Sequence, residues 1–481
     1  MSANTYSAPD GSPLLRRVRR ETGRFTGIAL PRRGRIRAVL ILAGIALCWL
    51  ALRGRGSATT GVPARVERAP EVRAVKPQPA PEPQVPPRPA APRPPRDDLS
   101  FEEVAVLLRR HASQLSLSGD TLHTGRKHFI VHYSVDTALQ RYGATLLRRY
   151  HPKYGAIAVM ESATGRVLAL VSYTHEGEPY LGRDLYARSL FPAASVFKIV
   201  SAAGAMEKGR LTPDSELRYS GRNYTLYNSQ LAGTLRDYRT VTLQHAFAHS
   251  INPVFGRIGI NVLGRDGLLE YAARFGFGLE TPFELAVDTA LLGPCDSAYA
   301  QAEVACGFNQ QTRMSPLFGA LLACAVSENG TMPAPHVVDS IIDMREWRRV
   351  YRAESQAWRA AVRPVTAANL ARMMQEVVRA GTARESFGIV KNTRAFDGFR
   401  CGGKTGSVDR DGVGRVDWFV GFAAHPSDPE RRLAAGIVTV HGAQWTVHSS
   451  YLAAEMFRLR IRALARHEAV VDARGQGDGD G

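Results

Sequence analysis

Lysine is scarce in this chain, with seven residues against 55 arginines. The imbalance bears on chemistry, because arginine keeps its proton at any physiological pH whereas a buried lysine can release it. Only one of the seven lysines, Lys198, has a serine three residues before it, namely Ser195. Because the chain otherwise uses arginine so much more often, a lysine at this position suggests that the side chain has to release its proton.

Cysteine is also scarce. The chain has five, and no cluster of cysteine and histidine has the spacing of a metal site. We therefore predict no metal and no other cofactor. Cys295 and Cys306 are eleven residues apart, and in an exported region they either form a disulfide or remain free thiols. Cys48 falls in an apolar run and Cys324 in an apolar helical pattern, so we expect both to be buried.

Long apolar runs are absent except for residues 38–52, which carry no charge over 15 residues. At about 1.5 Å per residue the run reaches roughly 22 Å, short of the ~30 Å hydrocarbon core, but Arg37 and Arg53 can reach the interfaces. We interpret it as an uncleaved, single-pass signal anchor. The alternative is a cleaved secretion signal, against which the Arg-Gly-Arg that follows the run counts.

Arginines set the expected orientation, because nine of them lie between residues 16 and 37. This excess predicts an arginine-rich cytoplasmic tail over residues 1–37, an anchor in the cell inner (cytoplasmic) membrane and a remainder on the periplasmic, extracytoplasmic side. The net charge of +18 would otherwise suggest a nucleic-acid binder, but residues 1–98 alone carry +11 of it. We therefore expect no nucleic acid as a partner.

The composition then changes twice along the chain. Twelve of the 28 prolines lie between residues 63 and 95, so residues 53–98 are predicted to be an extended linker. A globular domain is expected over residues 99–463, with a mainly helical subdomain over 209–320. The glycine- and aspartate-rich end, residues 464–481, is predicted to be a disordered tail.

Hydrophobic periodicity in the globular part predicts an α+β fold. Two early strands, 156–161 and 166–173, are joined by a glycine-containing turn, and three late strands follow at 401–408, 417–424 and 433–441. A further strand is expected at 127–134. Helices are expected between these groups and at 101–115, 135–150, 317–327, 367–380 and 447–464. The late strands and the short links favour an antiparallel sheet.

Ser195 and Lys198 are predicted to lie one turn apart at the start of a helix opened by Pro192. The hydroxyl and the amine can then meet, which gives the serine a base to take its proton. Taken alone, the pair also fits a helix start with a solvated lysine.

Two later segments carry similar polar groups. Ser250 and Asn252 precede Pro253, where the asparagine could cap a helix or bind a peptide group. Lys404, Thr405, Gly406 and Ser407 open a strand, where a lysine and hydroxyls beside glycines suit a carboxylate; a plain glycine-rich turn is the alternative.

Taken together, the three segments resemble the penicillin-recognising serine acyltransferases, which comprise penicillin-binding transpeptidases, D,D-carboxypeptidases and serine β-lactamases. The resemblance covers about residues 130–460. The sequence around these segments is also similar to that of the penicillin-binding transpeptidases, at residues 134–140, 162–170, 314–317, 381–383 and 417–421. It implies an antiparallel five-stranded sheet flanked by helices, plus an all-helical subdomain that carries Ser250.

The resemblance also implies a role for each residue. Ser195 would attack the penultimate D-alanine of a peptidoglycan stem peptide, and Lys198 would take its proton. Ser250 and Lys404 would return a proton to the leaving group, and Asn252 would orient the peptide. Substrate would also be bound at Thr405, Gly406 and Ser407, with the N–H groups of Ser195 and Ser407 as an oxyanion hole.

The implied function is a D,D-transpeptidase that cross-links stem peptides and is acylated and inhibited by β-lactams. The alternatives are a D,D-carboxypeptidase, a β-lactamase and a β-lactam sensor. Nothing marks Glu280 or Glu284 as the water-activating base of a β-lactamase, and the N-terminal tail is too short for a signalling module. Other cell-wall synthesis proteins could be partners, but neither a glycosyltransferase domain nor a long N-terminal pedestal fits between the linker and the catalytic domain.

Overall fold

The computed structural model describes residues 99–112, 117, 120–124, 127–235, 237–391 and 396–477. The expected cytoplasmic tail, signal anchor and proline-rich linker, together residues 1–98, lie outside the described residues. In the ranges that are described, no helix is both long enough and apolar enough to cross a membrane.

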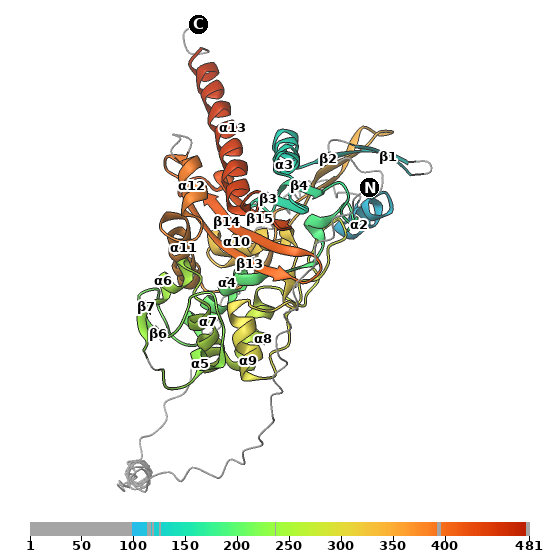
Figure 1. Cartoon of the computed structure of the whole chain (residues 1–481). Helices are drawn as coiled ribbons and strands as arrows, with labels where there is room; N and C mark the ends of the chain where they lie inside the picture. Colours follow the sequence, from blue (N-terminus) through green and yellow to red (C-terminus); the bar gives the residue numbers. More distant parts are fainter. Residues whose placement is uncertain are drawn as a thin grey trace, which may run out of the picture. The chain divides into compact units, whose positions relative to one another are not determined.

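A five-stranded antiparallel sheet forms the centre of the domain, with the strand order β13-β14-β15-β3-β4 (Figure 1). Two of its strands come early in the sequence and three come late, so the predicted α+β fold is confirmed. The bounds are β3 Tyr154–Glu161, β4 Val167–Thr174, β13 Arg400–Arg410, β14 Gly414–Ala424 and β15 Arg432–His441. β13 is an edge strand, which leaves one side of its backbone without a neighbouring strand in this sheet.

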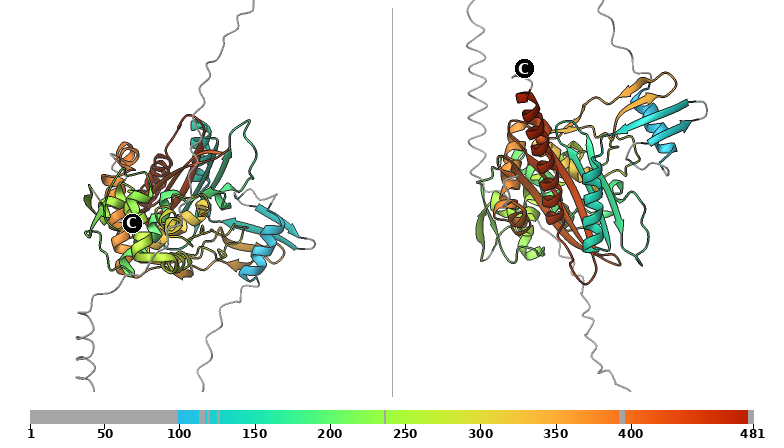
Figure 2. Two further views of the ribbon diagram at one scale, coloured as in Figure 1. Left: turned by 60° about the horizontal axis from the view of Figure 1, so that its bottom comes forward. Right: turned by 90° about the horizontal axis from the view of Figure 1, so that it is seen from above.

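Helices cover both faces of the sheet because its central strands are apolar on both sides. β3 is buried along its whole length, and β14 and β15 are buried over most of theirs. The apolar helix α10 (Pro316–Ser327) packs on one face, and α3 (Thr137–Tyr150) and α13 (Ser449–Gly477) pack together on the other (Figure 2). A Cβ at Gly436 would lie 2.0 Å from the Pro316 carbonyl oxygen, so α10 can approach β15 only at a glycine.

The other elements described are mostly short and connect or flank these layers. In chain order they are α2 Phe101–Arg110, β1 Asp120–Thr124, β2 Lys127–Tyr133, η1 Leu185–Ala187, β5 Phe191–Pro192, η2 Ala194–Phe197, α4 Lys198–Glu207, β6 Glu216–Tyr219, α5 Asn228–Leu231, β7 Arg239–Thr242, α6 Leu243–Ala248, α7 Asn252–Ile258, η3 Gly259–Leu263, α8 Gly264–Arg274, α9 Ala298–Cys306, β8 Arg313–Met314, β9 Thr331–Pro333, β10 Val338–Asp343, β11 Arg348–Arg352, β12 Ala357–Ala360, α11 Pro364–Arg379, α12 Arg384–Lys391 and η5 Pro429–Arg431.

The structure differs from two boundary predictions. The region 209–320 is mainly helical but also contains the antiparallel hairpin of β6 and β7. Each strand has only four residues, most of them exposed or half-buried, so no alternation long enough to detect is present. At the other end, α13 continues to Gly477, whereas a disordered tail was expected from residue 464. Alanine and arginine, both good helix formers, recur in that stretch.

A second sheet, with the order β1-β2-β10-β11, combines the N-terminal residues with a much later segment. Only its strand β2 was predicted. β2 and β10 pair antiparallel and place Val131 opposite Ile341, while Leu99, just before α2, donates its N–H to Val350 at 3.0 Å. Residues 99–133 therefore belong to a small β-rich module completed by an insertion between α10 and α11.

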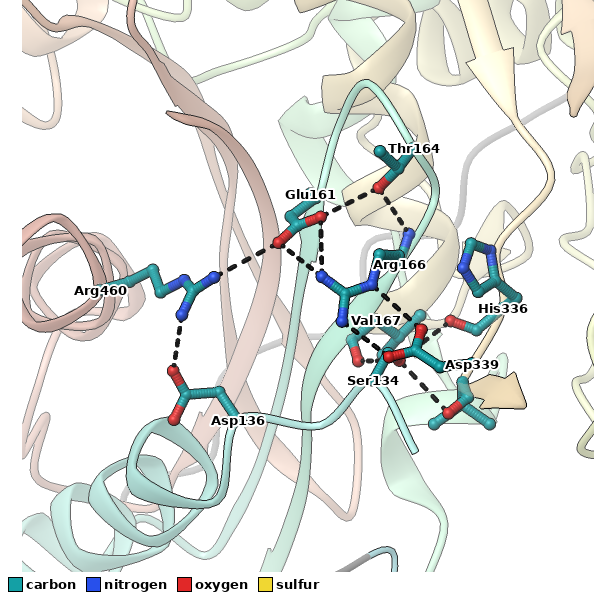
Figure 3. Close-up of polar contacts among 10 residues, drawn as sticks. Ser134, Asp136, Glu161, Thr164, Arg166, Val167, His336, Asp339 and Arg460 are labelled. Atoms are coloured by element: carbon teal, nitrogen blue, oxygen red, sulfur yellow. Dashed lines mark hydrogen bonds and ion pairs between the residues drawn. The ribbon is translucent and has the colours of Figure 1, made fainter. Parts of the chain in front are cut away.

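A cluster of ion pairs connects this module to the main sheet and to α13 (Figure 3). Arg166, just before β4, donates to Asp339 of β10 at 3.1 and 2.7 Å and to Glu161 at 3.2 and 3.3 Å. Arg460 of α13 then bridges Glu161 at 3.3 Å and Asp136 at 3.1 Å. Glu161 is 4% exposed, so its charge depends on these two arginines for compensation.

Cys295, Cys306 and Cys324 are buried free thiols, and Cys401 is buried as well. Cys295 and Cys306 are therefore free thiols in the structure and do not form the disulfide that was the alternative. Cys324 is buried in α10 as expected, and Cys48 lies outside the described residues.

We predict that Arg166→Ala lowers the free energy of unfolding by about 1–3 kcal/mol, because it leaves the buried Glu161 short of a partner and cuts the link to β10. Arg166→Lys should recover only part of the loss, since an ammonium cannot form the paired bonds to Asp339. Urea unfolding followed by circular dichroism measures both. Arg372→Ala, which breaks an exposed pair with Asp214, is the matched control. A loss no larger than that of the control would contradict the assignment.

Candidate active site

Ser195 lies in a tight turn that joins a short strand to a helix. β5 pairs with β8 through Phe191 and Pro192, the 3-10 turn η2 follows, and α4 begins at Lys198. Pro192 is the last residue of this strand and lies just ahead of the helical turn, and its carbonyl oxygen accepts a hydrogen bond from the Trp418 indole at 2.7 Å. The three-residue spacing of Ser195 and Lys198 survives, since a 3-10 turn also brings residues i and i+3 to one side.

The backbone of this turn is held in place from the side of α9. Ala194 has a φ of +49°, which is unusual for a residue with a Cβ. The turn after α9 presses against it at Gly307, where a Cβ would lie 1.8 Å from the Ala194 carbonyl oxygen. Only glycine fits there, so the position of Ser195 depends on this contact.

Lys198 is the centre of the polar contacts. Its Nζ lies 2.7 Å from Ser195 Oγ, 2.7 Å from Asn252 Oδ1 and 3.2 Å from Ser250 Oγ. The side chain is fully buried, and burial lowers the pKa of Lys198 to about 8. A lysine in this state has a substantial neutral fraction near physiological pH, so it can accept the proton of the adjacent serine.

Ser250 and Asn252 reach the lysine from the connection between α6 and α7. Ser250 has a φ of +56°, which turns the chain sharply between the two helices. Ile251 occupies the N-cap position of α7, so the alternative in which Asn252 caps this helix is wrong: its side chain accepts from Lys198 instead. The Asn252 backbone N–H is bound by the Asn223 carbonyl at 2.7 Å.

Lys404 enters the same cluster from the edge strand β13. Its Nζ donates to Ser250 Oγ at 3.0 Å and to the Thr405 carbonyl at 2.9 Å. Lys404 is also fully buried; burial and, secondarily, the nearby Lys198 hold its pKa well below the usual lysine value. Within the described residues, no hydrogen bond of the Lys198 or Lys404 amine goes to a carboxylate. Keeping both amines charged at the same time is therefore unfavourable.

Glycine brings the edge strand against the nucleophile turn. A Cβ at Gly406 would meet the backbone nitrogens of Ser195 and Val196 at 3.1 Å each, which is tighter than ordinary contacts. The Thr405 hydroxyl bonds that of Thr382, and the Ser407 hydroxyl donates to Asp417 Oδ1 at 3.3 Å. The oxyanion hole that the family resemblance implies, with N–H groups of Ser195 and Ser407, requires such a contact between strand and turn, and a glycine is the residue that permits it.

These side chains border one cleft of about 820 Å³. Of the sequence-predicted site residues, Ser195, Ser250, Asn252, Thr405, Gly406 and Ser407 line it, while Lys198 and Lys404 lie directly behind it. The cleft is also lined by residues to which sequence reasoning assigned no role, among them Tyr224, Glu303, Thr382 and Asp417. Thr382 and Asp417 lie in the segments 381–383 and 417–421, which are similar to the penicillin-binding transpeptidases. No local sequence pattern marks Tyr224 or Glu303.

Asp417 is buried in the wall of the cleft and connects β13 to α13. Its Oδ2 accepts the Ser449 N–H at the first residue of α13, at 2.7 Å, and the Ser449 hydroxyl donates to the Asp417 carbonyl at 2.8 Å. A carboxylate at a helix N-terminus is favoured by the helix dipole, yet burial dominates and raises the pKa of Asp417 to about 7. Asp417 thus fixes the far end of the strand segment that lines the cleft.

Comparison with known proteins agrees with this geometry. The family described as the penicillin binding protein transpeptidase domain matches residues 155–458. The stage V sporulation protein D of Bacillus subtilis is 25% identical over 311 residues, which are 61% of this chain and 46% of that protein. The peptidoglycan D,D-transpeptidase PbpA of Mycolicibacterium smegmatis is 26% identical over 354 residues, 66% of this chain and 68% of that one. The chain therefore spans about half of the first relative's length.

A solved structure shows the same fold. Penicillin-binding protein A from Mycobacterium tuberculosis, in its penicillin G acyl-enzyme complex, superimposes with a TM-score of 0.53 and 22% identity, covering 69% of this chain and 80% of that one. The central sheet, the covering helices and the family match over most of the chain lead to one conclusion: this chain belongs to the penicillin-binding protein transpeptidase domain family.

Proposed function

We propose that the chain is a serine D,D-transpeptidase that cross-links peptidoglycan stem peptides through an acyl-enzyme on Ser195. One observation carries the proposal: the buried Lys198 amine lies 2.7 Å from Ser195 Oγ, with a pKa lowered to about 8. A serine needs such a base to become a nucleophile. The names of the relatives, as D,D-transpeptidases, support the choice of substrate.

Acylation would begin when neutral Lys198 takes the proton of Ser195 as its Oγ attacks the carbonyl of the penultimate D-alanine. The backbone N–H groups of Ser195 and Ser407 would stabilise the oxyanion. Ser250, which both amines contact, would pass a proton to the nitrogen of the leaving D-alanine. The bond between the two D-alanines then breaks, and an ester to Ser195 remains.

Binding of the substrate would use the edge strand β13. Lys404 and Thr405 would hold the terminal carboxylate, Gly406 lets the strand lie against the nucleophile turn, and Asn252 would bind a peptide group of the stem. An amine of a second stem peptide would then attack the ester and form the cross-link. A penicillin would take the same route and leave Ser195 blocked.

The placement in the cell follows from the N-terminal residues. Residues 38–52 would anchor the chain in the inner membrane, residues 1–37 would be cytoplasmic, and residues 53–98 would be a linker to a catalytic domain on the periplasmic side. Neither Glu280 nor Glu284 lines the cleft. The carboxylate of Glu284 accepts hydrogen bonds from the N–H groups of Val337 and Val338. Glu280 and Glu284 are therefore not placed to activate water for a β-lactamase.

The first prediction concerns penicillin labelling. A fluorescent penicillin should label the wild-type chain and stay bound for many minutes, whereas Ser195→Ala should not be labelled. Intact mass spectrometry and peptide mapping would locate the adduct. Release of the label within seconds would point to a β-lactamase, and labelling of Ser195→Ala would remove the nucleophile from the proposal.

The second prediction concerns the pH dependence of acylation. The neutral fraction of Lys198 rises with pH and levels off above its pKa, so the second-order acylation rate should rise between about pH 6 and 8 and be flat above about 9. Lys198→Arg should acylate at least about a hundredfold more slowly at every pH, because arginine keeps its proton. Circular dichroism controls for folding. A pH-independent wild-type rate, or normal acylation of the arginine variant, would contradict the role of the base.

The third prediction separates cross-linking from trimming. With purified stem peptides, the wild-type chain should form a dimer that has lost one D-alanine, detected by mass spectrometry. Because Thr405 is expected to hold the terminal carboxylate, Thr405→Val should lower the yield about tenfold or more. A product that is only the monomer without its D-alanine would show a carboxypeptidase.

A further inference from the structure

The catalytic cleft contains one carboxylate that has no protein partner. Three acidic residues line the cleft: Glu303, Asp409 and Asp417. Asp409 is bound by the Arg415 guanidinium at 2.7 and 2.8 Å, and Asp417 accepts the bonds from Ser407 and Ser449 given above. The Glu303 carboxylate has no hydrogen bond or ion pair within the described ranges, although the residue is half-buried.

Glu303 is held in a fixed place relative to the nucleophile. It lies on α9, which starts at the Ser297 cap and ends at Gly307, the residue packed on Ala194. The Ser201 hydroxyl of α4 donates to the Ala305 carbonyl at 2.7 Å, so α9 is also tied to the helix that carries Lys198. A side chain on this part of α9 cannot shift independently of the turn that contains Ser195.

Among the described residues, no cation forms an ion pair with Glu303. Burial raises the pKa of Glu303, and it also raises that of its titratable neighbours Tyr299 and Cys306, the latter to about 11. Both neighbours are therefore neutral near pH 7. A partly desolvated carboxylate without a cation favours a ligand that brings one.

The wall of the cleft also carries exposed aromatic rings. Tyr224 and Phe308 also line the cleft, and they are 63% and 42% exposed. Aromatic faces of this kind bind ammonium groups through the ring quadrupole. The cleft thus offers a carboxylate and two exposed rings in addition to the strand β13 that would hold the donor peptide.

We propose that Glu303 binds the primary ammonium of the acceptor stem peptide and takes its proton in the step that resolves the acyl-enzyme. This rests on the proposed function and assigns the acceptor side of the same cleft. One proton moves from the ammonium to the carboxylate, and the freed amine attacks the ester carbon. The carbon–Oγ bond breaks, and the second amine proton returns through Lys198 to Ser195 Oγ.

The test compares two nucleophiles on one acyl-enzyme. The donor is a D-alanyl thioester peptide without any amine, so an effect on amines can come only from the acceptor. The acceptors are a peptide with one free primary amine, which is an ammonium at pH 7.5, and hydroxylamine, which is mostly neutral there. Mass spectrometry of the full chain's reaction products gives the ratio of peptide product to hydroxamate.

In Glu303→Gln the ratio should fall by about a hundredfold, the lower end of the range for losing a general base. Glu303→Asp should recover part of the ratio, because it keeps the carboxylate. Asp214→Asn, which changes a carboxylate that pairs with Arg372 and does not line the cleft, is the matched control and should keep the wild-type ratio.

An unchanged ratio in Glu303→Gln would overturn the inference. So would a selective loss of hydrolysis, because the carboxylate would then activate water. Both results leave the proposed function intact. That function fails separately if the thioester does not acylate Ser195, or if Ser195→Ala releases product as fast as the wild type.

Discussion

The buried amine of Lys198 is the contact on which the rest of the site depends. Ser195 comes from the nucleophile turn, Ser250 and Asn252 come from the connection between α6 and α7, and each places an oxygen within 3.2 Å of this nitrogen. Burial of an amine without a carboxylate is unfavourable for its charged form. The fold accepts this cost because the neutral form is the one that catalysis would use. The Lys198 amine in turn adds to the effect of burial in lowering the pKa of Lys404.

Close backbone approach is the second constraint. Gly307 lets the end of α9 press on Ala194, and Gly406 lets the edge strand β13 lie against Ser195. A methyl group at either position would push the nucleophile turn away from the lysine or from the strand. The turn itself carries a left-handed alanine, a conformation that persists only where the surroundings enforce it. The site is thus held by backbone contacts as much as by side chains.

Much of this could be predicted from the sequence. Long apolar strands and the apolar helix α10 gave clear patterns, so the composition of the central sheet was predictable. The three-residue spacing predicted that the side chains of Ser195 and Lys198 would be in contact, because residues i and i+3 lie on one side of both an α-helix and a 3-10 helix. The three polar segments could be placed in one cleft only through the family resemblance, since nothing local indicates that residues 198, 250 and 404 meet.

What could not be predicted depends on contacts between distant segments. The small sheet pairs Val131 with Ile341, and neither strand has a strong pattern by itself. The capping role considered for Asn252 was reasonable locally, but Lys198 competes for its side chain. No sequence motif marks Glu303. The role proposed for it rests on its position in the cleft and on the absence of a partner for its carboxylate in the described structure.

The most direct measurement is the pKa of each lysine by NMR with ¹⁵N-labelled side chains, which the small number of lysines makes practical. The account predicts that the signal removed by Lys198→Met titrates near pH 8, and the one removed by Lys404→Met also titrates below the normal range. If all of the lysines titrated near 10.5, the buried amine would not be a base and the account would be wrong.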